Sequence, residues 1–227
     1  MNRIYERRLL KFAKGGKMKY IGHLDLQRIF QSAIRRAKLP VAYSMGFNPH
    51  QRLSFALPLP VGLESICEYI EILLEEPADV MALDGHLPDG LVPLTSWIIP
   101  EKAPGPAAAL SAADYRLTFA SAADVMEIVS SIWEANEIIM TKKTKKGEAQ
   151  VDIRPDILSL RHDPVGAVIM RLSAGSTRNL SPALVAQKIC PSGEDPLIVR
   201  LEMYGGTTEN LVLLHEAISN NYIDRKF

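Results

Sequence analysis

A segment rich in proline, alanine and glycine, residues 100–113, divides the chain into two parts of similar length. It has neither helical nor strand periodicity, which is typical of a linker. We therefore predict a domain boundary here, with one domain over residues 1–99 and a second over residues 114–227. Each part has the size of an ordinary single domain.

The first part predicts the element order β-α-β-β-α-β. Apolar residues recur three and four apart from Leu26 to Ala37, which indicates an amphipathic helix that ends before Pro40. Residues 77–87 suggest a second, short helix. Alternating apolar and polar residues predict strands at residues 8–13, 53–59, 70–75 and 91–99.

The second part repeats this order, with helices predicted at residues 125–133 and 182–189 and a terminal helix near 209–219. Strands are predicted at residues 115–119, 137–141, 151–154, 167–173 and 197–204. Two successive βαββαβ units are what a duplicated ferredoxin-like fold produces. We therefore predict an α+β protein with two ferredoxin-like domains in tandem, each an antiparallel sheet with helices on one face.

Composition favours an ordinary folded protein without a cofactor of its own. Hydrophobic residues make up 47% of the chain, and no apolar run approaches the length of a membrane span, so we expect a cytoplasmic protein. Cys67 and Cys190 lie in apolar runs and are expected to be buried thiols. Because there is no Cys-x-x-Cys pair and the histidines are scattered, we expect no metal or iron–sulfur site from this chain alone.

Charge is distributed very unevenly along the chain. The first 52 residues hold twelve lysines and arginines against Glu6 and Asp25, a net +10, and the remainder holds fourteen basic and twenty-four acidic residues, a net −10. Such asymmetry predicts a polyanion site on the basic part. The residues expected to bind nucleic acid are Lys14, Lys17, Lys19, Arg28, Arg35, Arg36 and Arg52.

A second group of residues is expected to contact the substrate more specifically. It consists of His23, Asp25, Gly46, Phe47, Asn48, Pro49 and His50. Phe47 and Tyr20 have rings that can stack on an unpaired base, which suits single-stranded or looped RNA. The same residues also fit a solvated basic face, with Asp25 as a first-turn residue that stabilises the helix dipole.

The histidines leave a catalytic alternative open. Imidazole is a common acid and base in catalysis, so His23 and His50 are weak candidates for these roles in RNA cleavage. Histidines with a structural or hydrogen-bonding role are the preferred interpretation. The basic run from Lys142 to Lys146 is either a solvated hairpin tip or an extension of the anion-binding surface.

Several motifs in order resemble the radical-SAM-linked protein family. They are residues 14–26, 33–37, 39–50 and 53–62, with Glu64-Ser65 and Glu68-Tyr69. That family is a domain of unknown function, found beside or fused to B12-binding-type radical SAM proteins. The chain departs from the pattern at Gly22, where serine is usual, and at Gln51, where a second proline commonly follows His50.

The resemblance implies a radical SAM partner that supplies S-adenosylmethionine and the iron–sulfur cluster. Together with the basic segment, it predicts an accessory module that binds RNA, such as tRNA or rRNA, and presents it to that partner. Two alternatives remain. One is a metal-independent endoribonuclease resembling the CRISPR-repeat-processing enzymes, and the other is a protein-docking module with no nucleic acid.

Overall fold

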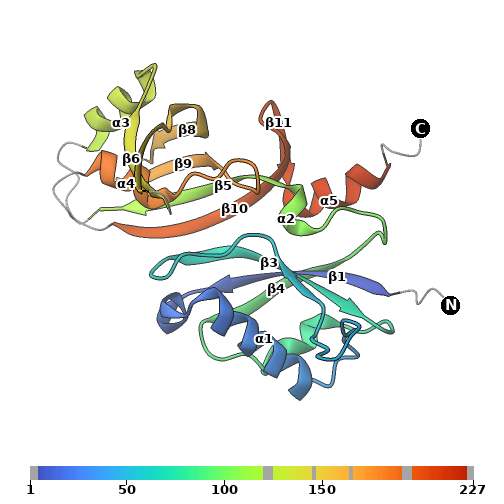
Figure 1. The fold of residues 1–227 in the computed structure, drawn as a ribbon. Coiled ribbons are helices and arrows are strands. Elements are labelled where there is room, and N and C mark those ends of the chain that lie inside the picture. The colour runs from blue at the N-terminus through green and yellow to red at the C-terminus, as the bar shows by residue number, and fades with distance from the viewer. Residues whose placement is uncertain (1–4, 120–124, 145–146, 164–165, 191–195, 224–227) are drawn as a thin grey trace.

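The computed structural model describes residues 5–119, 125–144, 147–163, 166–190 and 196–223. It is a mixed α+β structure with one large, mostly antiparallel sheet and few helices, which confirms the predicted class. Figure 1 shows the first part of the chain as a layer with α1 on its outer side, and the second part stacked above it. None of the described helices is long and apolar enough to cross a membrane.

The first part of the chain forms the edge of the sheet with the path β4-β1-β3, and β2 pairs with β3. Its elements are β1 (Glu6–Lys14), the 3₁₀ turn η1 (Gly16–Tyr20), α1 (His23–Arg36), β2 (Leu53–Phe55), β3 (Glu64–Leu74), the 3₁₀ turn η2 (Val80–Leu83) and β4 (Leu91–Ile99). All three pairings are antiparallel.

The second part continues the sheet with the path β10-β5-β9-β8, again antiparallel, and β11 pairs with β10. A separate hairpin, β6-β7, is inserted before β8. The elements are α2 (Pro106–Ala109), β5 (Leu110–Thr118), α3 (Val125–Glu134), β6 (Ile139–Thr144), β7 (Gly147–Asp152), η3 (Arg154–Asp156), β8 (Ile157–His162), β9 (Val168–Ser173), α4 (Pro182–Ile189), β10 (Leu197–Thr207), β11 (Asn210–Leu213) and α5 (Leu214–Ile223).

The two parts join where β3 meets β10. These strands pair in parallel through Val199 with Glu64 and Arg200 with Ser65. The sheet therefore runs unbroken from β4 to β8.

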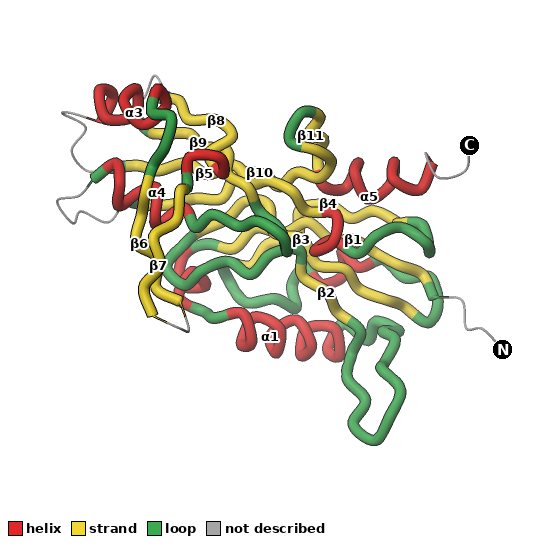
Figure 2. Tube along the Cα trace, turned by 45° about the horizontal axis from the view of Figure 1, so that its top comes forward, coloured by secondary structure: helices red, strands yellow, loops and turns green. Residues whose placement is uncertain are grey.

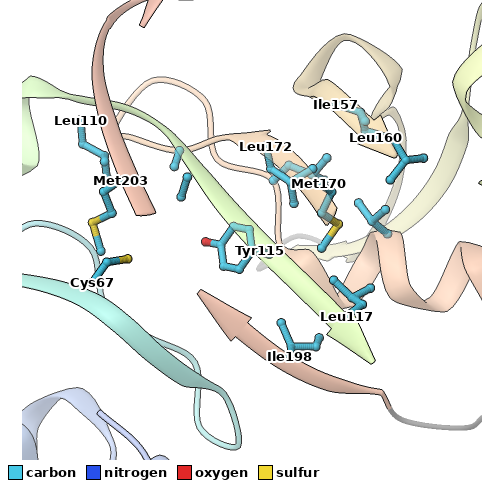
Figure 3. Packing of buried hydrophobic residues seen from close by; sticks show 14 of the residues in the cluster. Cys67, Leu110, Tyr115, Leu117, Ile157, Leu160, Met170, Leu172, Ile198 and Met203 are labelled. Carbon is cyan, nitrogen blue, oxygen red and sulfur yellow. The ribbon is translucent and has the colours of Figure 1, made fainter. Parts of the chain in front are cut away.

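The buried side chains form two clusters. One lies between α1 and the sheet and includes Phe12, Phe30 and Ile72. The other fills the second part of the chain but also contains residues of β1 and β3, among them Cys67, whose side chain faces Met203 in Figure 3. The two parts of the chain thus share a core. Cys67 is buried as expected, whereas Cys190 is half-buried, and neither forms a disulfide.

Residues 100–113 are not an unstructured linker. They contain α2 and the first residues of β5, and Ala109, Leu110 and Ala113 are buried. The alanines that resembled linker composition are small enough to pack in this crowded place, because Gly205 lies against Ala109 and Ala217. The predicted division into domains at this segment stays a prediction.

Several predicted elements differ from those observed. The helix expected over residues 77–87 is only the turn η2, because Pro77, Gly85 and Pro88 limit the helical run and Asp79 caps it by accepting a hydrogen bond from the N–H of Met81 (2.9 Å). The strand expected over residues 53–59 ends at Phe55, before Pro58. Strands β8 and β11 were not expected, and β11 occupies the start of the predicted terminal helix.

Candidate nucleic-acid interface

Helix α1 presents a basic side to solvent. Its apolar residues, including Leu26, Phe30 and Ile34, are buried against the sheet. The opposite side exposes Arg28, Arg35 and Arg36. The helical period of 3.6 residues explains this separation, because apolar residues three and four apart fall on one face.

Each exposed arginine of α1 keeps unused N–H groups. Arg28 pairs with Asp25 (2.8 Å) on a solvent-exposed turn, and Arg35 donates to the Ser32 hydroxyl (3.0 Å). Arg36 donates to the carbonyl oxygen of His86. A guanidinium carries five N–H donors, so each group retains donors for an anion.

Lys38 stands just beyond the end of α1 and is also exposed. Its φ of 54° is the left-handed conformation that often ends a helix, and the N–H of Leu39 then donates to the carbonyl of Ile34. It adds a fourth cation to the three exposed arginines of α1. We call Arg28, Arg35, Arg36 and Lys38 the α1 basic face.

The basic residues of β1 and η1 have a different environment. Arg7 pairs with Glu71 (2.6 Å), Lys11 with Glu202 (2.6 Å) and Lys19 with Glu64 (3.5 Å). Each of these carboxylates comes from the acidic remainder of the chain. The positive charge of the first 52 residues is therefore partly neutralised within the protein, and only part of it forms an exposed surface.

Lys14 lies inside the protein. Its relative exposure is 1%, and its ammonium is 3.5 Å from the carbonyl oxygen of Lys19. Burial lowers the pKa of Lys14, with Glu68 opposing that shift and Arg200 adding to it. Lys14 is therefore not placed to bind phosphate at the surface, whereas Lys17 on η1 is exposed.

A buried ion pair stands beside Lys14 at the join between the two parts. Arg200 donates to Glu68 (2.8 Å) with side-chain exposures of 1% and 3%, and it also donates to the hydroxyl of Tyr115 (3.3 Å). Both charges are paired and hydrogen-bonded, as buried charges need to be. This cluster has the features of a structural contact.

The 43–51 loop connects α1 to β2 and projects from the body of the protein (Figure 2). Tyr43 and Gln51 form an antiparallel bridge at its base. Ser44 closes the loop by accepting from the N–H of His50 (3.0 Å), and its hydroxyl is 2.9 Å from His50 Nδ1. Gly46 has a φ of 122°, a value that suits glycine.

The tip of this loop is exposed and apolar. The relative exposures of Met45 and Phe47 are 93% and 111%, and Asn48 and Pro49 beside them are exposed as well. Large apolar side chains held this far from any packing partner are typical of interaction sites. The structure thus brings Gly46, Phe47, Asn48, Pro49 and His50 together in one prominent loop.

An open hollow of about 410 Å³ lies at the base of the loop. It is lined by residues that include Gln27, His50, Arg52, Ser54 and Glu71. Arg52 is exposed and its guanidinium lies over the Tyr5 ring, 5.5 Å from the centroid. The hollow therefore places the guanidinium of Arg52 near His50.

His23 and Asp25 are not part of this hollow. The His23 ring packs edge-on against Phe55, with centroids 5.1 Å apart, and Asp25 pairs with Arg28. The two histidines therefore have different surroundings, Phe55 for His23 and Ser44 for His50. Among the described residues, no group of three or more His, Cys, Asp or Glu side chains could hold a metal ion.

The positions of Ser32 and His86 beside the α1 arginines were not anticipated from the sequence. The position of Ser32 could have been predicted, because Arg28, Ser32 and Arg36 are four residues apart and so share one side of the helix. The approach of residues 85–88 to the helix had no local signal. The side chains of Lys142 to Lys146 lie outside the described residues.

The profile of the family described as "Uncharacterized protein conserved in bacteria (DUF2344)" matches residues 7–182. No curated protein matches the chain.

Solved structures do match, among them a chain of "Crystal Structure of a Cbf5-Nop10-Gar1 Complex" at 11% sequence identity and a TM-score of 0.45. The match covers 96% of this chain and 56% of that one, so the protein spans little more than half the length of that neighbour. A likeness at this level carries no functional inference.

Proposed function

We propose that the chain, which belongs to the DUF2344 family of proteins conserved in bacteria, acts as an RNA-binding accessory module. The observation that carries the proposal is the α1 basic face, where Arg28, Arg35 and Arg36 are exposed and retain free donors. Arginine is suited to phosphate because its planar fork makes two parallel hydrogen bonds to phosphate oxygens.

The 43–51 loop supports RNA as the polyanion. The loop follows α1 in the chain, and its exposed Phe47 offers a ring on which an unpaired base can stack. Asn48 and His50 add polar groups beside that ring. Phosphate contacts from the helix and base contacts from the loop would together favour single-stranded or looped RNA over a duplex.

The proposal includes a radical SAM partner, which rests on the family resemblance of residues 14–62. The partner would supply S-adenosylmethionine and the iron–sulfur cluster, and this chain would position tRNA or rRNA for modification. Such a role places the protein in the cytoplasm.

We also propose that the sheet consists of two ferredoxin-like units in tandem. This arrangement is supported by the strand orders β4-β1-β3-β2 and β10-β5-β9-β8. If the strands of each unit are numbered along the chain, leaving out the separate β6-β7 hairpin, both units have the order 4-1-3-2. In the first unit the turn η2 would replace the second helix.

The test is binding of bulk cellular RNA at low salt by the wild type and by Arg35→Glu/Arg36→Glu. We expect the double variant to lose at least about tenfold in affinity, since two phosphate contacts become repulsive. The matched control is Arg116→Glu/Arg161→Glu, which reverses two exposed arginines on β5 and β8. Equal losses in both variants, or no salt-sensitive binding by the wild type, would refute the proposal.

A protein-docking module without nucleic acid is a second candidate, favoured by the exposed Met45 and Phe47. It predicts that the purified protein carries no nucleic acid, which the ratio of absorbance at 260 and 280 nm measures. RNA cleavage in EDTA that disappears with His50→Ala would instead support the endoribonuclease alternative.

A further inference from the structure

A groove runs along α1 beside the loop that precedes β4. Its volume is about 480 Å³, within the range of roughly 300–1,000 Å³ that small-ligand sites occupy. The residues that define it are Arg28, Ile29, Ser32 and Arg36 from α1 and His86 and Leu87 from the facing loop.

The polar groups of the groove are arranged in a row. Arg28, Ser32 and Arg36 are four residues apart, so they follow one line along the helix, and about 12 Å separates the two ends of the row. Arg36 is held in place because it donates to the carbonyl oxygen of His86 across the groove. Ser32 accepts from Arg35, so its own hydroxyl hydrogen is available to a ligand.

Among the described residues that line the groove, none carries a carboxylate. Asp25 pairs with Arg28 from outside the groove, on an exposed turn where such pairs are weak. An anion entering the groove would therefore meet two guanidinium groups and a hydroxyl, and it would compete with Asp25 only for Arg28.

Apolar side chains line the groove next to this row. Ile29 comes from the helix, and Leu87 and Pro88 from the facing loop. A ligand that fills the groove would therefore place an anionic group near the arginines and a flat or apolar group on these residues.

We propose that the groove is a nucleotide subsite that binds one phosphate through Arg28, Ser32 and Arg36 and packs the base or ribose against Ile29 and Leu87. This inference deepens the proposed function, because the nucleotide would be one unit of the bound RNA. The same chemistry would also accept a free mononucleotide, and the experiment separates these sources.

The first experiment uses the wild-type protein with four probes: UMP, uridine, O-phosphoserine and inorganic phosphate. We expect UMP to shift the methyl NMR signals of Ile29 and Leu87, and to bind at least about fivefold more tightly than O-phosphoserine, because only UMP supplies both the anion and the ring. Uridine should not bind measurably. If UMP and O-phosphoserine bind equally, or if UMP leaves both methyl signals unchanged, the assignment is wrong.

The second experiment fills the groove without changing its charge. Ser32→Trp should weaken binding of UMP and of a fluorescent oligouridylate about tenfold, the loss expected when charge-assisted hydrogen bonds are blocked. The matched control is Ser130→Trp, because Ser130 is also a helical serine, with its hydroxyl donating to the carbonyl oxygen of Met126 (3.0 Å), but it lies on α3. The control should bind both probes as the wild type does.

The outcomes separate this inference from the proposed function. If UMP binds in the groove but no RNA binds, the site is for free nucleotides and the proposed function fails alone. If RNA binds to the α1 basic face but Ser32→Trp binds RNA as tightly as the wild type, the groove assignment fails alone. The methyl shifts in the wild type decide the matter even if Ser32→Trp does not fold.

Discussion

The basic residues of β1 and those of α1 are close in sequence, but the former are paired or buried and the latter are exposed. On β1, Arg7 and Lys11 are paired with carboxylates of β3 and β10, and Lys14 is buried. On α1, Arg28, Arg35 and Arg36 face solvent. The difference arises because a central strand is covered on both faces, whereas a surface helix has one face left for water. A run of positive charge therefore indicates a binding surface only where the secondary structure leaves it exposed.

The largest expected effect is a loss of protein stability when the buried Arg200–Glu68 pair is broken. Glu68→Ala would leave Arg200 and Lys14 buried without their carboxylate, so we expect a loss of about 3–5 kcal/mol in the free energy of unfolding. Urea denaturation measures it. Asp25→Ala removes the exposed partner of Arg28 and should cost less than about 1 kcal/mol. Similar losses in the two variants would break the comparison.

Arg7 tests whether a β1 cation is structural. It donates to Glu71 and to the carbonyl oxygens of Pro100 (2.9 Å) and Ala103 (2.6 Å), so it ties β1 to the segment before α2. We expect Arg7→Met to lower the free energy of unfolding by about 2 kcal/mol. Arg35→Met should change it by no more than about 0.5 kcal/mol, since Arg35 is exposed. Thermal melting of the two variants compares them directly.

The salt dependence of RNA binding should depend on the α1 arginines and not on the basic residues of β1. We expect Arg28→Met to reduce the slope of log affinity against log salt by about 0.7, the value for one lost contact with single-stranded nucleic acid. Lys11→Met should leave the slope unchanged, because Lys11 is already neutralised by Glu202. A reduced slope in Lys11→Met would show that β1 also contacts RNA.

The smallest effect concerns the pH dependence of stability. Burial lowers the pKa of Lys14 from its ordinary value of 10.5, so the unfolded chain binds more protons than the native protein between the two pKa values. The wild type should therefore gain stability relative to Lys14→Met as the pH rises towards 10.5. Urea denaturation at several alkaline pH values measures the difference, and a difference independent of pH would contradict the assignment of a lowered pKa.

The periodicity of apolar residues correctly predicted those helices and strands that bury one face. The apolar spacing from Leu26 to Ala37 identified α1, and the alternation over residues 91–99 identified β4 with the bounds observed. The helix predicted over residues 182–189 is α4, and Pro182 suits its first turn because proline has no N–H to leave unpaired there. These elements bury one face each, so sequence periodicity reports them directly.

The pairing partners of the basic residues could not be predicted in this way. Glu71, Glu64 and Glu202 reach Arg7, Lys19 and Lys11 through long-range strand pairing, which leaves no local signal. Lys14 resembled a surface lysine because Gly15 and Gly16 follow it. It nevertheless lies on the same buried face of β1 as Leu10 and Phe12, since alternate residues of a strand point to the same side. The exposed loop was easier, since Gly46 and Asn48-Pro49 are turn signals.

The short junction between β3 and β10 has a consequence for how the protein folds. Ser65 and Arg200 are far apart in sequence, so their contact closes a long loop and is expected to form late. Until β10 is synthesised, the β1–β3 surface around Cys67 and Tyr69 lacks its contacts with β10, so we expect an early intermediate that is prone to aggregation. Chaperone dependence should therefore be greater for a chain truncated before Leu197 than for the full one.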